Sequence, residues 1–307
     1  MLVEPKLLVT TLGLPDGTTV DDEPLGGTAA APERVRLRPP GGSERIVLLR
    51  ASFDAGEAMN HLAVMESLTN RGFEHAPKLL AVIDEVAVEE WIDASNALAI
   101  VPPPGAIELG VRALAALHGL ALREGLDWEK DRGDLFPEDE VPLHRLGFAA
   151  EERETARAAL AEAREVLLAS PFGFAHNNAT AAHLLFSKDR AVIINFEQSG
   201  FGAQLLDVAA FLLTSGVEAA GRRVLASQYA AVRGMDVDAT ADLVDLVGIL
   251  WGIEELLKLP RRQIQSMGDD GAMEALLTMA ARIDRGLKAA AGGHPLAARI
   301  RTALWPS

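Results

Sequence analysis

The sequence predicts an α+β protein with a small β-rich lobe followed by a larger, mainly helical lobe. Before residue 102, short apolar runs of strand character alternate with turns rich in glycine and proline. After residue 105, apolar residues recur at the spacing of helices. The run Pro102-Pro103-Pro104-Gly105 separates the two patterns. We therefore predict lobes at residues 1–101 and 102–307, joined by a hinge at these prolines.

The first lobe is expected to form a small antiparallel sheet with one helix. Its strand-like runs are LLVTTLGL (7–14), ERVRLR (33–38), ERIVLLR (44–50), KLLAVID (78–84) and VAVEEWI (86–92). The helix is expected over residues 54–70, with Asp54 as its N-cap. An apolar stripe recurs there at helical spacing, at Ala58, Leu62, Met65 and Leu68.

The second lobe is expected to contain long helices and one β-hairpin. Helical patterns cover residues 106–125, 149–170 and almost everything after residue 205. The hairpin is expected at residues 184–196, where two apolar runs flank a polar turn. His118 ends an apolar helix face, and we interpret it as a hydrogen-bonded core residue.

Composition and charge narrow the class of protein. The chain has 307 residues, 49% of them apolar, and no cysteine, so we expect neither disulfides nor a thiolate metal site. No run approaches the roughly 18 apolar residues of a membrane span, and no export signal is recognisable, so we expect a cytoplasmic protein. The net charge of −15, with scattered basic residues, argues against binding to nucleic acid.

Acidic residues are concentrated in residues 124–140. This segment contains eight acidic residues and only two basic ones, Lys130 and Arg132. The simpler interpretation is a solvated surface. The alternative is an acidic wall that attracts a cationic ligand or partner. The partner itself, a small molecule or a protein, is not specified by the sequence.

Four segments together resemble one known family. They are EPLGGTAAAPERVRL (23–37), RIVLLR (45–50), FAHNNATAAHLLF (174–186) and IINFEQSGFGAQLLDVAAF (193–211). In this order they resemble the glycine-rich turn, the cationic strand, the His-Gly-Asp-x-x-x-x-Asn motif and the Ile-Asp-Phe-Glu motif of the aminoglycoside phosphotransferases. The resemblance implies a bilobal protein-kinase-like fold and transfer of a phosphoryl group from ATP with Mg²⁺.

The resemblance also marks departures at the positions that perform the chemistry. Asn178 stands where the family has the aspartate that accepts the proton, and His183 and Asn195 stand at its Mg²⁺-binding positions. From these changes we predict a degenerate family member: a catalytically inactive pseudokinase that acts as a binding or regulatory module, with no cofactor and no metal site. The alternative is a divergent small-molecule kinase that uses ATP and Mg²⁺ to phosphorylate a hydroxyl acceptor.

Other positions follow from the same resemblance. Gly26, Gly27 and Arg50 are the residues expected to face a nucleotide. His61 stands where the family's helix has a glutamate that pairs with the cation, and the candidate substitutes are Glu57, Glu66 and Glu197. Glu197 is more simply a capping or salt-bridged acid. His176 is expected to brace the catalytic-type loop and Asp207 to anchor its backbone.

Overall fold

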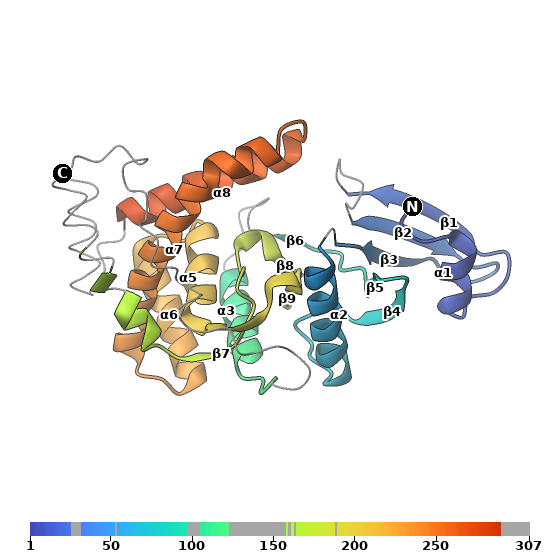
Figure 1. Ribbon diagram of the computed structural model, residues 1–307. Coiled ribbons are helices and arrows are strands. Elements are labelled where there is room, and N and C mark those ends of the chain that lie inside the picture. The colour runs from blue at the N-terminus through green and yellow to red at the C-terminus, as the bar shows by residue number, and fades with distance from the viewer. Residues whose placement is uncertain are drawn as a thin grey trace. The chain divides into compact units, whose positions relative to one another are not determined.

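The computed structural model describes residues 1–25, 32–52, 54–96, 105–122, 158, 161–162, 164–187 and 189–289 (Figure 1). These form two compact units. The first comprises Met1–Ala94 with Val192–Ser199, and the second comprises Ser95–Ala191 with Gly200–Ser307. The predicted α+β class is confirmed, because an antiparallel sheet comes first and helices dominate afterwards.

The first unit is built on a five-stranded sheet in the order β1-β2-β3-β5-β4, with every neighbouring pair antiparallel. Alternate side chains point into one core, where Val35, Leu37, Val47, Leu49 and Val88 are fully buried. The strands are β1 (Thr19–Pro24), β2 (Glu33–Arg38), β3 (Arg45–Arg50), β4 (Leu79–Ile83) and β5 (Val86–Glu90).

The strand expected at residues 7–14 is wrong, because this segment contains helix α1 (Pro5–Thr11). Pro5 opens the helix, where its fixed φ suits the first turn and its missing N–H costs nothing. Leu8 and Val9 are buried, and Leu8 belongs to the core under the sheet. A helix this short buries only a few apolar residues, so its sequence pattern does not differ from that of a strand.

Helix α2 (Ala55–Asn70) confirms the predicted helix and its cap, since the Asp54 carboxylate accepts from the Glu57 N–H at 2.9 Å. Its buried face differs in one place from the expected stripe. Leu62 is only partly buried, whereas the neighbouring His61 is 3% exposed. His61 is polar but pairs with a buried carboxylate, described below, and this compensates its burial.

The second unit is helical and is centred on α5 (Gln204–Thr214), nearly all of whose residues are buried. Four helices pack around α5 (Figure 1). They are α3 (Ala106–His118), α6 (Ala219–Arg233), α7 (Val237–Gln265) and α8 (Asp270–Ala289). None of the helices in the described ranges is long and apolar enough to cross a membrane.

Short strands carry the two motif segments. The predicted hairpin is confirmed, as β8 (Leu184–Phe186) lies between β6 (Ser95–Asn96) and β9 (Ala191–Ile193) in one sheet. A second ribbon, not predicted, pairs β7 (Phe172–Ala175) with β10 (Gly200–Ala203). The proline hinge, the acidic stretch 124–140 and most of the helix expected at 149–170 lie outside the described residues.

Candidate functional site

The loop after β7 is held to the helical core by Asp207, in the first turn of α5. The Asp207 carboxylate, 1% exposed, accepts from the His176 backbone N–H at 2.6 Å and from His118 Nε2 at 3.0 Å. Within the loop, the Asn178 N–H donates to His176 Nδ1 at 3.3 Å. Both expectations for this loop are therefore confirmed: Asp207 anchors its backbone and His176 braces it.

His118 extends this network to a third helix. Its Nδ1 lies 2.8 Å from the Tyr229 hydroxyl on α6, and its ring is buried. Burial raises the pKa of the Tyr229 phenol above its ordinary value, so the hydroxyl stays protonated and donates to His118. The prediction that His118 is a hydrogen-bonded core residue is confirmed. The loop is anchored by a buried chain of hydrogen bonds through Asp207, His118 and Tyr229.

Asn177 explains why a glycine is needed on the neighbouring strand. Its backbone is left-handed, with φ of 61°, a conformation that asparagine tolerates better than most residues. Its side chain lies over Gly202 of β10, so a β-carbon at Gly202 would overlap the Asn177 amide oxygen. The absence of a side chain at Gly202 therefore leaves the space that the Asn177 side chain occupies.

The structure brings Asn178 and His183 together in one turn. His183 Nδ1 donates to the Asn178 carbonyl at 2.6 Å, and the Thr180 N–H donates to the same oxygen at 2.8 Å. Because Nδ1 carries the proton in this bond, the loop itself uses one of the two ring nitrogens. The Asn178 side chain is a neutral amide, which does not accept a proton near neutral pH.

In the first unit, Arg50 at the end of β3 is paired with Glu89 of β5. Arg50 Nε donates to Glu89 Oε1 at 3.3 Å, and His61 Nε2 lies 2.8 Å from the same oxygen. Neither Glu57 nor Glu66 forms this pair, so the counter-ion comes from a strand and not from helix α2. Sequence reasoning missed Glu89, although an acid inside the apolar run of β5 was a usable signal.

Glu89 keeps its charge in spite of its burial. It is 1% exposed, and burial alone would raise its pKa. The hydrogen bond from His61 and the charge of Arg50 outweigh burial and hold the pKa of Glu89 below its ordinary value. Arg50 and His61 therefore both pair with one buried carboxylate, that of Glu89.

Asn195 follows β9 and also contacts Arg50. Its backbone is left-handed, with φ of 68°, and its Oδ1 lies 3.5 Å from Arg50 Nη1, a long hydrogen bond. The next residues are fastened to α2 by Asn60, which sequence analysis did not single out. Asn60 Nδ2 donates to the carbonyls of Glu197 at 2.9 Å, Ser199 at 2.8 Å and Phe196 at 3.4 Å.

Glu197 does not fit its simpler interpretation as a capping or salt-bridged acid. Its carboxylate has no hydrogen-bond or ion-pair partner within the described part of the chain. It is close enough to Glu57 to contribute, after burial, to raising the pKa of Glu57. Glu197 also lines a small pocket in the first unit, together with Arg50, Ser52 and His61.

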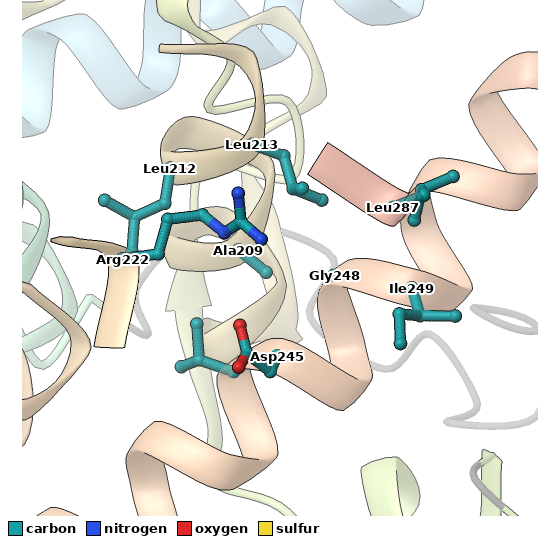
Figure 2. A pocket seen from close by; sticks show the side chains of 9 residues that line it. Ala209, Leu212, Leu213, Arg222, Asp245, Gly248, Ile249 and Leu287 are labelled. Carbon is teal, nitrogen blue, oxygen red and sulfur yellow. The ribbon is translucent and has the colours of Figure 1, made fainter. Parts of the chain in front are cut away.

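A second small pocket lies among the helices of the second unit (Figure 2). Leucine and isoleucine side chains surround Arg222 and Asp245 there. Burial lowers the pKa of the Arg222 guanidinium and raises the pKa of the Asp245 carboxyl. Arg222 donates to the carbonyls of Val217 at 3.0 Å and Gly286 at 3.1 Å, so its role is to connect α6 to α8.

Comparison with known proteins places these features in a family. The family model described as the phosphotransferase enzyme family matches residues 23–243. This chain belongs to the phosphotransferase enzyme family. No curated protein matches the chain.

Solved structures of similar fold extend over almost the whole chain. A choline/ethanolamine kinase family protein from Mesorhizobium loti is 19% identical, with a TM-score of 0.65, covering 97% of this chain and 98% of that one. The choline kinase of Streptococcus pneumoniae is 15% identical, with a TM-score of 0.59, covering 92% and 96%. An aminoglycoside phosphotransferase from Alicyclobacillus acidocaldarius is 14% identical, with a TM-score of 0.59, covering 99% and 97%. At these identities the likeness establishes the protein-kinase-like fold.

The phosphotransferase family implies Mg²⁺ and ATP, and the side chains at its metal positions fit Mg²⁺ poorly. Mg²⁺ prefers anionic or carbonyl oxygen ligands. His183 offers imidazole, and Asn195 offers a neutral amide whose oxygen already contacts Arg50. In the described ranges, no group of three or more histidines and acids has the arrangement of a metal site. Gly26 and Gly27, expected to face a nucleotide, lie outside the described residues.

Proposed function

We propose that this member of the phosphotransferase family is a pseudokinase, which binds a small molecule or a protein partner without transferring a phosphoryl group. The observation that carries the proposal is Asn178, a neutral amide at the family's proton-accepting position. Because Asp207, His176 and His118 hold the loop as the family motif implies, Asn178 stands in an ordered loop. Asn178 therefore differs from the family's residue in its chemistry, while the fold of the loop is kept.

The loss of the general base lowers the rate of transfer directly. The attacking hydroxyl must lose a proton as it reacts, and an amide does not accept it. Removing a general base typically costs about 10²–10⁴ in rate. This supports a protein in which phosphoryl transfer is too slow to be the function.

The metal positions support the same proposal. Phosphoryl transfer depends on cations that neutralise the charge developing on the phosphates. Arg50 places a permanent positive charge beside Asn195, where the family holds a carboxylate for Mg²⁺. The neutral amide of Asn195 supplies no negative charge to a divalent cation, so we propose a protein that does not depend on Mg²⁺·ATP.

The comparisons favour a second candidate, a small-molecule kinase that phosphorylates a hydroxyl acceptor. The family is described as one of enzymes, and the structures of similar fold carry the names of choline, ethanolamine and aminoglycoside kinases. These names favour activity more directly than inactivity, whereas the residues of the site favour the pseudokinase. In the second candidate the carboxylate of Glu197 is available as a substitute base or metal ligand.

Calorimetry with ATP distinguishes the two candidates. We expect weak binding of ATP that is the same with Mg²⁺ and with EDTA, because the metal ligands are missing. Micromolar binding of ATP that requires Mg²⁺ contradicts the pseudokinase and supports the kinase. A loss of this Mg²⁺ dependence in Glu197→Gln, but not in Glu66→Gln on the exposed face of α2, identifies Glu197 as the substitute ligand.

A further inference from the structure

We infer that His61 controls, through the Glu89 carboxylate that it shares with Arg50, how strongly Arg50 attracts an anionic group. Binding of an anion at Arg50 is thereby linked to the uptake of a proton by His61. The inference deepens the proposed ligand-binding role, because it describes an anion site that works without Mg²⁺. It concerns only residues of the first unit.

The charges of the cluster depend on one proton. Glu89 Oε1 is the common partner of Arg50 Nε, at 3.3 Å, and of His61 Nε2, at 2.8 Å. With His61 neutral, the charges of Arg50 and Glu89 cancel. With His61 protonated, the three side chains carry a net charge of +1, which offsets part of the negative charge of Glu85 and Glu197 in the same pocket. An anion near Arg50 is then bound more tightly.

The atom that takes the proton is His61 Nδ1. Nε2 already faces Glu89, whereas Nδ1 is buried and has no hydrogen-bond partner among the described residues. The pocket of the first unit lies beside this ring, and Arg50 and Ser52 line it as well. A proton on Nδ1 without an acceptor is costly, and an oxygen of a bound anion or of a water in the pocket provides that acceptor. Proton and anion therefore favour each other's binding, and the coupling is reciprocal.

The other charged groups around His61 come from each neighbouring element. They are Arg50 on β3, Glu89 on β5, Glu85 before β5, Glu197 after β9 and Glu57 on α2. Imidazole is the side chain whose ordinary titration falls between pH 5 and 8. Glu57 is the second group to control, because burial, followed by the charges of Glu197 and Asp54, raises its pKa.

Sulfate is the probe, since it keeps its charge between pH 5.5 and 8 while phosphate does not. NMR titrations at constant ionic strength follow the Arg50 Nε–H and the His61 ring. We expect sulfate to bind about tenfold more tightly at pH 5.5 than at pH 7.5. Sulfate should also raise the pH at which the wild-type His61 ring titrates, a result that requires no variant.

Variants assign the effect. His61→Gln is expected to remove the pH dependence, and Arg50→Gln to remove the shift of the His61 titration. His75→Gln, a histidine of the same unit that packs edge-on against Phe73, and Glu57→Gln are expected to keep the wild-type profile. The inference is overturned if wild-type sulfate affinity is flat with pH, if sulfate does not bind, or if the slope survives in His61→Gln. Those results leave the proposed function untouched, since calorimetry with Mg²⁺·ATP tests it separately.

Discussion

At the scale of single residues, Gly202 shows how the loop imposes a residue type on a strand. A methyl group there would overlap the Asn177 side-chain oxygen and lie 3.1 Å from Ala175 Cβ. We expect Gly202→Ala to lower the free energy of unfolding by about 1–3 kcal/mol, because tightly packed atoms must move. Urea denaturation measures the change.

Gly200→Ala is the matched control on the same strand. A β-carbon at Gly200 has its nearest neighbour, Asn177 Nδ2, at 3.9 Å, which is ordinary contact. We expect no loss of stability, and a gain of a few tenths of a kcal/mol from the less flexible unfolded chain. Equal effects of the two substitutions would show that the Asn177 side chain does not occupy this position.

The residues of the site were predictable where a motif fixes the neighbours along the chain. The Asp207 anchor and the His176 brace followed from such motifs, and the core position of His118 followed from its place at the end of an apolar helix face. Glu89 and Asn60 did not, because neither lies in a segment that carries the family resemblance, and their partners lie 39 and more than 130 positions away. Such pairs arise from strand register and helix docking, which the local pattern of a sequence does not contain.

At the scale of elements, α2 holds the turn after β9 through one side chain. Asn60→Asp replaces the donor to the carbonyls of Glu197 and Ser199 with a carboxylate, which repels them. We expect a loss of about 1–3 kcal/mol in the free energy of unfolding, because these acceptors lose their partner. Amide hydrogen exchange over residues 195–199 should become faster.

Asn70→Asp makes the same chemical change at the exposed end of α2. It is expected to alter stability by less than about 0.5 kcal/mol and to leave exchange at 195–199 unchanged. If both variants behave alike, the clamp at Asn60 is not what orders this turn.

Helices and strands were predictable where they are long or begin at a clear capping residue. Helix α2 and its Asp54 cap followed from spacing and from the capping residue. Helix α1 did not, since its seven residues bury too few side chains to establish a period. The ribbon of β7 and β10 was missed as well, because its strands are four residues each and are joined only through pairing distant in sequence.

At the scale of the whole molecule, the order of the sheet, the hairpin and the helices along the sequence is that of the family to which the chain belongs. The same frame does not decide activity, because a fold carries many functions. At Asn178, His183 and Asn195 the printed hydrogen bonds are in place, and the side chains are two neutral amides and an imidazole. We therefore propose that the loop keeps its order but lacks the groups needed for phosphoryl transfer.

A single-turnover assay with enzyme in excess over labelled ATP, with Mg²⁺ and with choline, ethanolamine or an aminoglycoside, tests this claim most directly. We expect no phosphorylated acceptor from the wild type. We expect the triple variant Asn178→Asp, His183→Asn, Asn195→Asp to regain Mg²⁺ binding at most, because α2 still carries His61 where the family has a glutamate. Acceptor-dependent transfer by the wild type that disappears in Asn178→Ala would contradict the account and identify a working kinase with a different mechanism.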